Sequence, residues 1–274
     1  MIRKLNALEY LNFSIGQPYN LVVVLCIKGA ILKNELKIAL GKVQQKHPLL
    51  KVRIQIDEEG SYYFISEDVG EIPIETTEFE NDSKTTKFFL RNLEIPFDMD
   101  NINQPLFRVT FLSSPQRNDV ILCAQHTITD GLSMALLTRD LVHILNNPDI
   151  EVTPVNSPMS EKDIFPPKIR RRIPNSTFRT RILLFFLRLY YFLRYGKKKE
   201  DLRYATDYKE DDLRLISWNL SKDETDMFIQ LCKFKEVSVH SAICTAFSPD
   251  ISIINNPVNL RGRLNYPIGE AFGL

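Results

Sequence analysis

The hydrophobic and polar residues of the first fifty positions follow two different periods, and each period predicts one kind of element. Residues 19–29 (YNLVVVLCIKG) form a nearly continuous apolar run, which predicts a strand buried on both faces of a sheet. In residues 32–47 the apolar positions recur every three or four residues, which predicts an amphipathic helix that ends before Pro48. Its expected inward residues are Leu32, Leu36, Ala39, Leu40 and Val43.

The chain from residue 51 to residue 146 continues to alternate between strand and helix patterns. Two short runs on either side of Glu58, Glu59 and Gly60 are typical of a β-hairpin. Further runs predict additional strands and helices by the same two periods. The expected strands are residues 51–57, 61–66, 72–79, 106–114 and 119–127; the expected helices are residues 83–93, starting at a Ser cap, and 132–146, with Leu132, Ala135, Leu136, Leu141 and Ile144 inward.

The second half of the chain has a less regular pattern. Residues 147 to about 177 are rich in Pro, Ser and Asn, which is typical of a connection. Ser221 and Glu224 have the spacing of a capping box and predict the start of a helix. The expected elements are a basic apolar helix over 178–195, a strand over 213–221, helices over 221–234 and 238–247, and a strand over 251–260.

Strands and helices mix without strict βαβ alternation, and neither GxGxxG nor GxxxxGK[ST] occurs. We therefore predict an α/β fold of the α+β type, a mixed sheet covered by helices. We expect an N-terminal lobe over residues 1–146, a crossover linker over 147–212 and the start of a C-terminal lobe over 213–274.

Composition narrows the class of protein. The 274 residues are 44% hydrophobic, which is enough for a sizeable core, and the net charge of +1 argues against binding nucleic acid with the whole surface. The four cysteines form no CxxC pair, and no apolar leader precedes the first polar residues, so we expect free thiols in a cytoplasmic protein. The longest apolar stretch, residues 182–193, contains an Arg and is too short to cross a bilayer.

The stretch ILCAQHTITDGLSM (121–134) carries the chemistry that the sequence suggests. His126 ends an apolar run, and histidine is the side chain type best suited to act as a general base. Asp130 is placed either to hold the loop or to orient the ring, and we expect Gly131 to let the backbone bend sharply before the helix. The HxxxD spacing alone is common, and by itself it favours a structural histidine.

The surroundings of this stretch reverse that preference. QQKHPLLKVRI (44–54) and PFDMDNINQPLFRV (96–109) precede it at positions that resemble the condensation-domain and CoA-dependent acyltransferase superfamily. That superfamily includes chloramphenicol acetyltransferase, the condensation domains of peptide synthetases, and stand-alone acyltransferases of the phthiocerol dimycocerosyl transferase and alcohol acetyltransferase types. The resemblance covers about residues 5–145 and resumes in VSVHSAICTAF and NNPVNLRGRL.

The resemblance implies that His126 is the general base. It would deprotonate an acceptor that attacks an acyl thioester held on coenzyme A or on an acyl carrier protein, without a covalent acyl-enzyme and without a bound cofactor. Asp130 would be structural and would pair with Arg261, since PVNLR (257–261) matches the family's PVSGR. Oxyanion stabilisation is the largest expected rate contribution, and N–H groups near Gly131 are candidates for it.

The sequence departs from the family at two places. Condensation domains carry a double His, and the first position here is Gln125, which favours a stand-alone acyltransferase acting on a hydroxyl. The family's DFGWG-type motif is absent, so we expect a C-terminally truncated second lobe. Two alternatives stay open: an amide-forming condensation domain, and a non-catalytic homologue that only binds a substrate or a partner.

Two other groups of residues remain to be interpreted. Between residues 168 and 199 there are eleven Lys or Arg and no acidic residue, and Arg181 and Arg188 share one face of the predicted helix. This helix is an ordinary packed helix, a peripheral membrane contact with anionic lipid, or a site for donor phosphates. We expect His47 to be structural, at a helix end, and we expect no metal site because no histidine has partners at ligand spacing.

Overall fold

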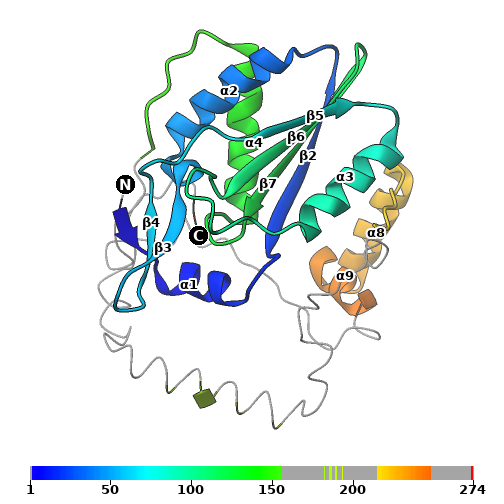
Figure 1. Ribbon diagram of the computed structural model, residues 1–274. Helices are drawn as coiled ribbons and strands as arrows, with labels where there is room; N and C mark the ends of the chain where they lie inside the picture. Colours follow the sequence, from blue (N-terminus) through cyan, green and yellow to red (C-terminus); the bar gives the residue numbers. More distant parts are fainter. Residues whose placement is uncertain are drawn as a thin grey trace. The chain divides into compact units, whose positions relative to one another are not determined.

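The computed structural model describes residues 2–155, 215–247 and 273, together with positions 182, 185, 186, 189 and 193 (Figure 1). The chain divides into two compact units: Met1–Leu213 with Arg261–Leu274, and Arg214–Leu260. Two expected elements, the basic helix over 178–195 and the strand over 251–260, fall wholly or largely outside the described residues. No described helix is long and apolar enough to cross a membrane.

The first unit contains the order of elements that the hydrophobic pattern predicts, preceded by one strand and one helix that the pattern did not reveal. Its elements are β1 (Ile2–Lys4), α1 (Ala7–Ser14), β2 (Asn20–Lys28), α2 (Lys33–Lys46), the 3-10 turn η1 (Pro48–Lys51), β3 (Arg53–Ile56), β4 (Tyr62–Ile65), β5 (Ile74–Glu78), α3 (Asp82–Glu94), β6 (Phe107–Ser113), β7 (Arg117–Gln125) and α4 (Gly131–Asn146). The predicted mixture of helices and sheets is therefore confirmed.

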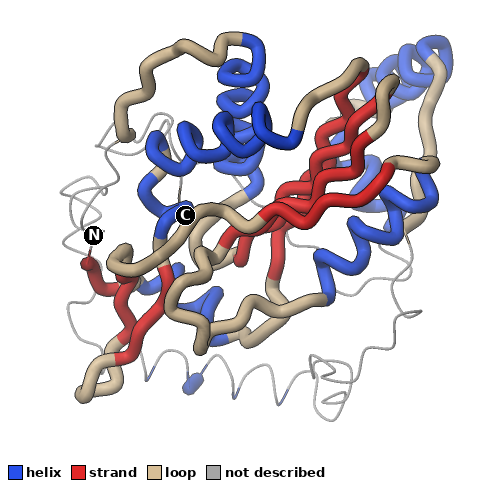
Figure 2. Tube along the Cα trace, turned by 45° about the horizontal axis from the view of Figure 1, so that its top comes forward, coloured by secondary structure: helices blue, strands red, loops and turns tan. Residues whose placement is uncertain are grey.

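The strands form two sheets, which Figure 2 shows as separate groups. The larger sheet has the order β2-β7-β6-β5, with β5 parallel to β6 and the other pairs antiparallel. The smaller sheet has the order β1-β4-β3 and is antiparallel, so the predicted hairpin over residues 51–66 is confirmed. The second sheet arises because β1 pairs with β4 of that hairpin.

Residues 19–29 contain the predicted strand, β2, but its side chains are only partly buried, and the predicted full burial on both faces is not found. β2 lies at the edge of its sheet and pairs with β7 alone among the described strands. Its apolar residues from Leu21 to Leu25 are half-buried, and Cys26 is exposed. A continuous apolar run indicates that both faces of a strand contact other residues. It does not indicate whether both edges of the strand are hydrogen-bonded to neighbouring strands.

Helices cover both faces of the larger sheet (Figure 1). α2 and α4 pack against each other and form one core with the β6 and β7 side chains Phe107, Val109, Phe111 and Leu122. α3 lies on the opposite face, where the Thr85 hydroxyl donates to Asp119 at 2.6 Å. The helix cap of α3 is Asn81, which accepts from the Lys84 N–H at 3.0 Å, and not the Ser that we expected.

The inward face of α2 is as predicted except for Leu32, which precedes the helix and is 65% exposed. The predicted inward face of α4 is confirmed at Leu141 and Ile144, whereas the prediction for its first turn is wrong. Leu132 and Ala135 are exposed. The buried residues of α4 are Ser133, Met134, Leu137, Asp140, Leu141 and Ile144. The hydrophobic pattern did not predict the whole buried face of α4, because that face contains a carboxylate, Asp140.

That carboxylate, Asp140, joins α4 to the end of α2. Its Oδ2 lies 2.9 Å from Nε2 of the fully buried His47 and 2.8 Å from Nζ of Lys46, and its Oδ1 lies 2.8 Å from Nη2 of Arg139. Burial raises the pKa of Asp140, but hydrogen bonds from Lys46, Arg139 and His47 outweigh it and bring the pKa below its ordinary value. His47 thus contacts a side chain of α4 as well as standing at the end of α2.

The chain after α4 packs back onto α2. Lys42 Nζ donates to the carbonyl of Ile150 at 2.9 Å, and the Val155 N–H donates to the carbonyl of Lys46 at 2.8 Å. Residues 147–155 therefore belong to the first compact unit.

The second unit contains α8 (Lys222–Phe234) and α9 (Val239–Phe247). The Ser221–Glu224 capping box is confirmed: the Ser221 N–H donates to Glu224 at 2.7 Å, and the Glu224 N–H donates to the Ser221 hydroxyl. The strand expected over 213–221 is not found in its described residues, 215–220, which have no regular structure. A strand requires a hydrogen-bonded partner, and the described part of this unit offers none.

The backbone argument for Gly131 is also wrong. Gly131 is the first residue of α4 and is not in the left-handed region, and a Cβ there would meet no atom within 4 Å. Gly60 differs, because its φ of +77° lies in the region that favours glycine.

Replacing Asp140 by Asn should lower the free energy of unfolding by about 2 kcal/mol at neutral pH, because Lys46 and His47 lose a buried carboxylate. A carboxyl whose pKa is lowered by folding stabilises the protein above its unfolded pKa, ordinarily 3.8, and this stabilisation disappears as the pH falls through the folded pKa. The difference between wild type and Asp140→Asn in urea unfolding should therefore shrink in strong acid. Asp149→Asn, an exposed carboxylate after the same helix, is the control. A difference that stays constant with pH would contradict the prediction.

Gly131→Ala should raise the free energy of unfolding by about 0.5 kcal/mol, because alanine favours helix and the added methyl meets open space. Gly60→Ala should lower it by about 1 kcal/mol, since its φ strains any other residue. Thermal unfolding of both variants measures the two shifts. Equal destabilisation by the two substitutions would show that Gly131 has a backbone role after all.

Candidate active site

His126 follows the last residue of β7 and stands opposite the residue before β2. Its N–H donates to the carbonyl of Tyr19 at 2.8 Å, which extends the β2–β7 pairing by one step. The Tyr19 ring stacks on the imidazole, with centroids 4.7 Å apart and planes 12° apart. The ring of His126 is half-buried. The strand pairing therefore fixes both the backbone and one face of the imidazole.

Helix α1 brings a second side chain to His126. Asn6 and Glu9 form a capping box at its start, and Arg3 of β1 donates twice to the buried Glu9, at 2.7 and 2.6 Å. One turn later, Asn12 is 7% exposed, and its Nδ2 lies 3.3 Å from the main-chain oxygen and 3.4 Å from Nδ1 of His126.

The sequence analysis missed both Asn12 and Tyr19. The Asn6–Glu9 spacing is a capping-box signal that would have placed α1. Nothing in the sequence alone shows that the last turn of this helix contacts His126.

The turn after His126 is closed by Gln125. Its side-chain oxygen accepts from the Thr127 N–H at 2.6 Å, and its carbonyl accepts from the Ile128 N–H at 3.1 Å. Gln125 is fully buried, as are Thr127 and Ile128. Gln125 therefore supports the turn from inside the protein.

Asp130 caps α4, because its Oδ1 accepts from the Ser133 N–H at 2.7 Å. The Ser133 hydroxyl in turn donates to the carbonyl of Gly273 at 2.8 Å, so a residue near the end of the sequence also lies at the start of α4. Of the two roles that the sequence left open for Asp130, this contact matches holding the loop. Arg261, Arg181 and Arg188 lie outside the described residues.

The arrangement leaves one edge of the imidazole available. Asn12 lies beside Nδ1 and Tyr19 covers one ring face, whereas no described residue lies within hydrogen-bonding distance of Nε2. A substrate group that reaches Nε2 would meet a ring held from two sides. Within the described residues, no three His, Cys, Asp or Glu side chains form a group suited to a metal ion.

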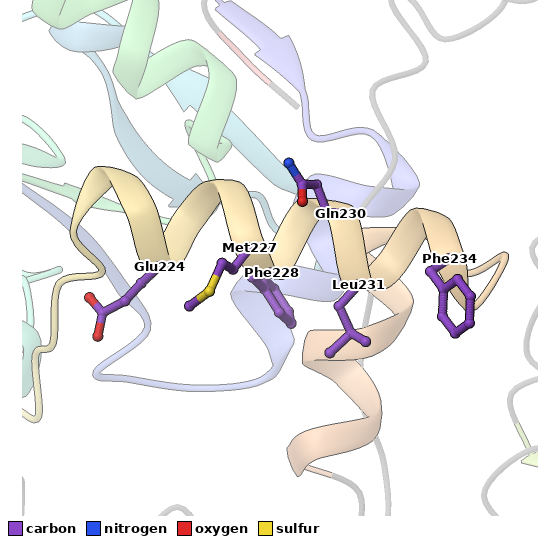
Figure 3. Close-up of a pocket in the computed structure, with 6 residues that line it drawn as sticks. All are labelled: Glu224, Met227, Phe228, Gln230, Leu231 and Phe234. Atoms are coloured by element: carbon purple, nitrogen blue, oxygen red, sulfur yellow. The ribbon is translucent and has the colours of Figure 1, made fainter.

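The second unit has a hollow of its own along α8. Figure 3 shows that its lining comes from α8 alone, with Met227, Leu231 and Phe234 largely exposed. Glu224, the one ionisable group there, already serves as the capping residue of the helix. A single helix face without convergent polar groups does not have the features of a catalytic site.

Comparisons with known proteins assign the region around His126 to a family. A family model described as Condensation domain matches residues 11–159. The FR901469 synthetase of Dothideomycetidae sp. (strain 11243) is 31% identical over 130 residues, which are 47% of this chain and 1% of that protein.

Solved structures with a similar arrangement include the starter condensation domain of the rhizomide synthetase, with 17% identity and a TM-score of 0.47. The first condensation domain of the calcium-dependent antibiotic synthetase has 19% identity and a TM-score of 0.47. Each comparison covers 57% of this chain and 40% of the other, so the chain spans well under half of these relatives. Polyketide synthase associated protein 5 from Mycobacterium tuberculosis has 17% identity and a TM-score of 0.42 over 57% of this chain and 36% of its own.

The family model covers more than half of the chain, and its range contains Asn12, Tyr19, His126 and the whole of α4. The chain belongs to the Condensation domain family.

Proposed function

We propose that this protein condenses an acyl thioester with an amine to form an amide, and that His126 is its catalytic residue. The observation that carries the proposal is the placement of His126 by the β2–β7 pairing, Tyr19 and Asn12, inside the region that the Condensation model matches. Its relative at 31% identity is a synthetase, which favours amide formation over transfer to a hydroxyl.

The proposed reaction needs no covalent intermediate on the protein. The amine nitrogen attacks the thioester carbon, and the electron pair of the C=O bond moves to oxygen. When the carbonyl re-forms, the C–S bond breaks, and the thiolate leaves and takes up the proton that the nitrogen loses. His126 acts at this centre, where an imidazole can donate or accept a hydrogen bond or a proton. We propose an acyl donor carried on coenzyme A or on a carrier protein as substrate, and no bound cofactor.

Transfer to a hydroxyl, the interpretation that the sequence first suggested, rested on Gln125 at the family's first histidine. Gln125 is fully buried and accepts from the Thr127 N–H, so its side chain shapes the turn and does not reach an acceptor. The identity of that residue therefore gives no reason to prefer an alcohol.

We further propose that Asp130 supports the site in two ways. Its hydrogen bond from Ser133 starts α4, and its charge pairs with Arg261, as the family resemblance implies. A half-buried carboxylate that both caps a helix and meets an arginine would hold the loop after His126 in one conformation.

His126→Ala should lower turnover of an acyl-pantetheine or acyl-CoA donor with a primary amine by about 100-fold or more, the usual contribution of a positioned acid–base group. Amide product is measured by mass spectrometry. His143→Ala, an exposed histidine on α4, should match the wild type. Equal turnover by His126→Ala and wild type would refute the assignment. Absence of turnover by folded wild-type protein with several donors and acceptors would support a homologue that only binds.

Asp130→Ser keeps a capping oxygen for Ser133, so it should preserve the start of α4, and it removes the charge proposed to pair with Arg261. Because the proposed partner is lost, turnover should fall by the same factor as in Arg261→Gln, and the double variant should fall no further. Losses that multiply in the double variant, or full activity of Asp130→Ser, would show that the two residues do not act together.

A further inference from the structure

We infer that Asn12 holds the neutral imidazole of His126 in the tautomer with its proton on Nε2, so that His126 meets the substrate as a hydrogen-bond donor. The tautomer follows from the contacts of Asn12 alone. Its consequence for catalysis rests on the function proposed above.

The orientation of the Asn12 amide is set by the main chain of His126. The carbonyl oxygen of His126 only accepts hydrogen bonds, so the amide group 3.3 Å away must be the donor, Nδ2. The same nitrogen lies 3.4 Å from Nδ1 of the ring. An amide nitrogen does not accept hydrogen bonds, so Nδ1 must be the acceptor, and a neutral ring then carries its proton on Nε2.

Asn12 has little freedom to turn away from this position. The residue is 7% exposed, and a buried amide that left its acceptors would lose hydrogen bonds that water could not fully replace. The helix that carries it is anchored by the Arg3–Glu9 ion pair and by the Asn6–Glu9 capping box. The imidazole stacks on the Tyr19 ring, and the backbone N–H of His126 donates to the Tyr19 carbonyl. Neither partner can therefore move without breaking another interaction.

The chain contains a second pair with the same geometry in a different environment. Asn147 Nδ2 lies 2.9 Å from the carbonyl oxygen and 3.4 Å from Nδ1 of His143. Both residues are exposed, so water competes for these groups, and the pair should not fix a tautomer. Asn147 is therefore a matched control for Asn12.

The inferred tautomer selects between acceptors. A neutral alcohol attacks a thioester slowly unless a base removes its proton, and a base acting at Nε2 needs that nitrogen unprotonated. A neutral amine attacks with its own lone pair. When the acceptor is an amine, Nε2 does not need to lose its proton. The Nε2–H group can donate to the thioester oxygen and stabilise the negative charge that develops there. The Asn12 contact thus favours amine acceptors. The general base expected from the family resemblance would need the other tautomer, with the proton on Nδ1.

The direct test is a long-range ¹H–¹⁵N correlation spectrum of the full-length protein, with His126 assigned by its loss in His126→Gln. In the wild type, Nδ1 of His126 should be unprotonated and Nε2 protonated. Asn12→Leu should give a mixture of tautomers. Asn12→Asp should reverse the tautomer or charge the ring, because a carboxylate accepts from Nδ1–H. Asn147→Leu should leave the His126 signals unchanged.

A wild-type ring with its proton on Nδ1, or an Asn12→Leu spectrum identical to the wild type, would overturn the inference. Unchanged signals of the buried His47 in each variant show that the protein is folded. Turnover adds a second measurement: Asn12→Asp should raise the ratio of ester to amide product, from matched alcohol and amine acceptors, at least about 10-fold, since a positioned base contributes about 100-fold or more. If no variant turns over but the spectra behave as expected, the proposed function fails and the tautomer stands.

Discussion

The register between β2 and β7 is the constraint on which the rest of the site depends. Asn20 stands opposite Gln125, so the next pair outward is Tyr19 and His126. That pairing supplies the hydrogen bond from the His126 N–H, the stacked ring and the position of the turn that leads to α4. A slip of one residue would place Tyr19 and His126 on opposite faces of the sheet and would destroy the site.

Buried charges join each of the helices around this strand pair to its neighbours. Arg3 holds Glu9 and with it α1, and Asp140 joins α4 to the end of α2. On the other face, burial raises the pKa of Asp119, but hydrogen bonds from Arg117 and Thr85 overcome that effect and lower it. A buried ion pair specifies one position because any other position leaves a charge without its partner. The packing of apolar side chains alone tolerates small shifts of a helix, whereas these pairs do not.

The exact placement of these helices matters because the proposed chemistry depends on which nitrogen of the His126 imidazole carries the proton. Asn12 approaches Nδ1 only because α1 is anchored one turn earlier, and α4 starts after His126 because Asp130 caps it. The site therefore consists of a strand end supported by two helix termini, each fixed by a polar contact distant from the imidazole. The acceptor preference inferred for His126 is a property of that whole arrangement and not of the HxxxD spacing.

The sequence by itself determined the order of elements from β2 to α4, the inward face of α2 and the capping box of α8, because these depend on local periodicity and local hydrogen bonds. It also indicated His126 as the candidate site residue, because the motifs around it can be recognised in the sequence alone. Only the tertiary structure decided that β2 is an edge strand, that the buried face of α4 contains Asp140, and that Asn12 and Tyr19 meet His126. Each of these depends on a partner more than eighty positions away along the chain, and hydrophobic periodicity carries no information about such a partner.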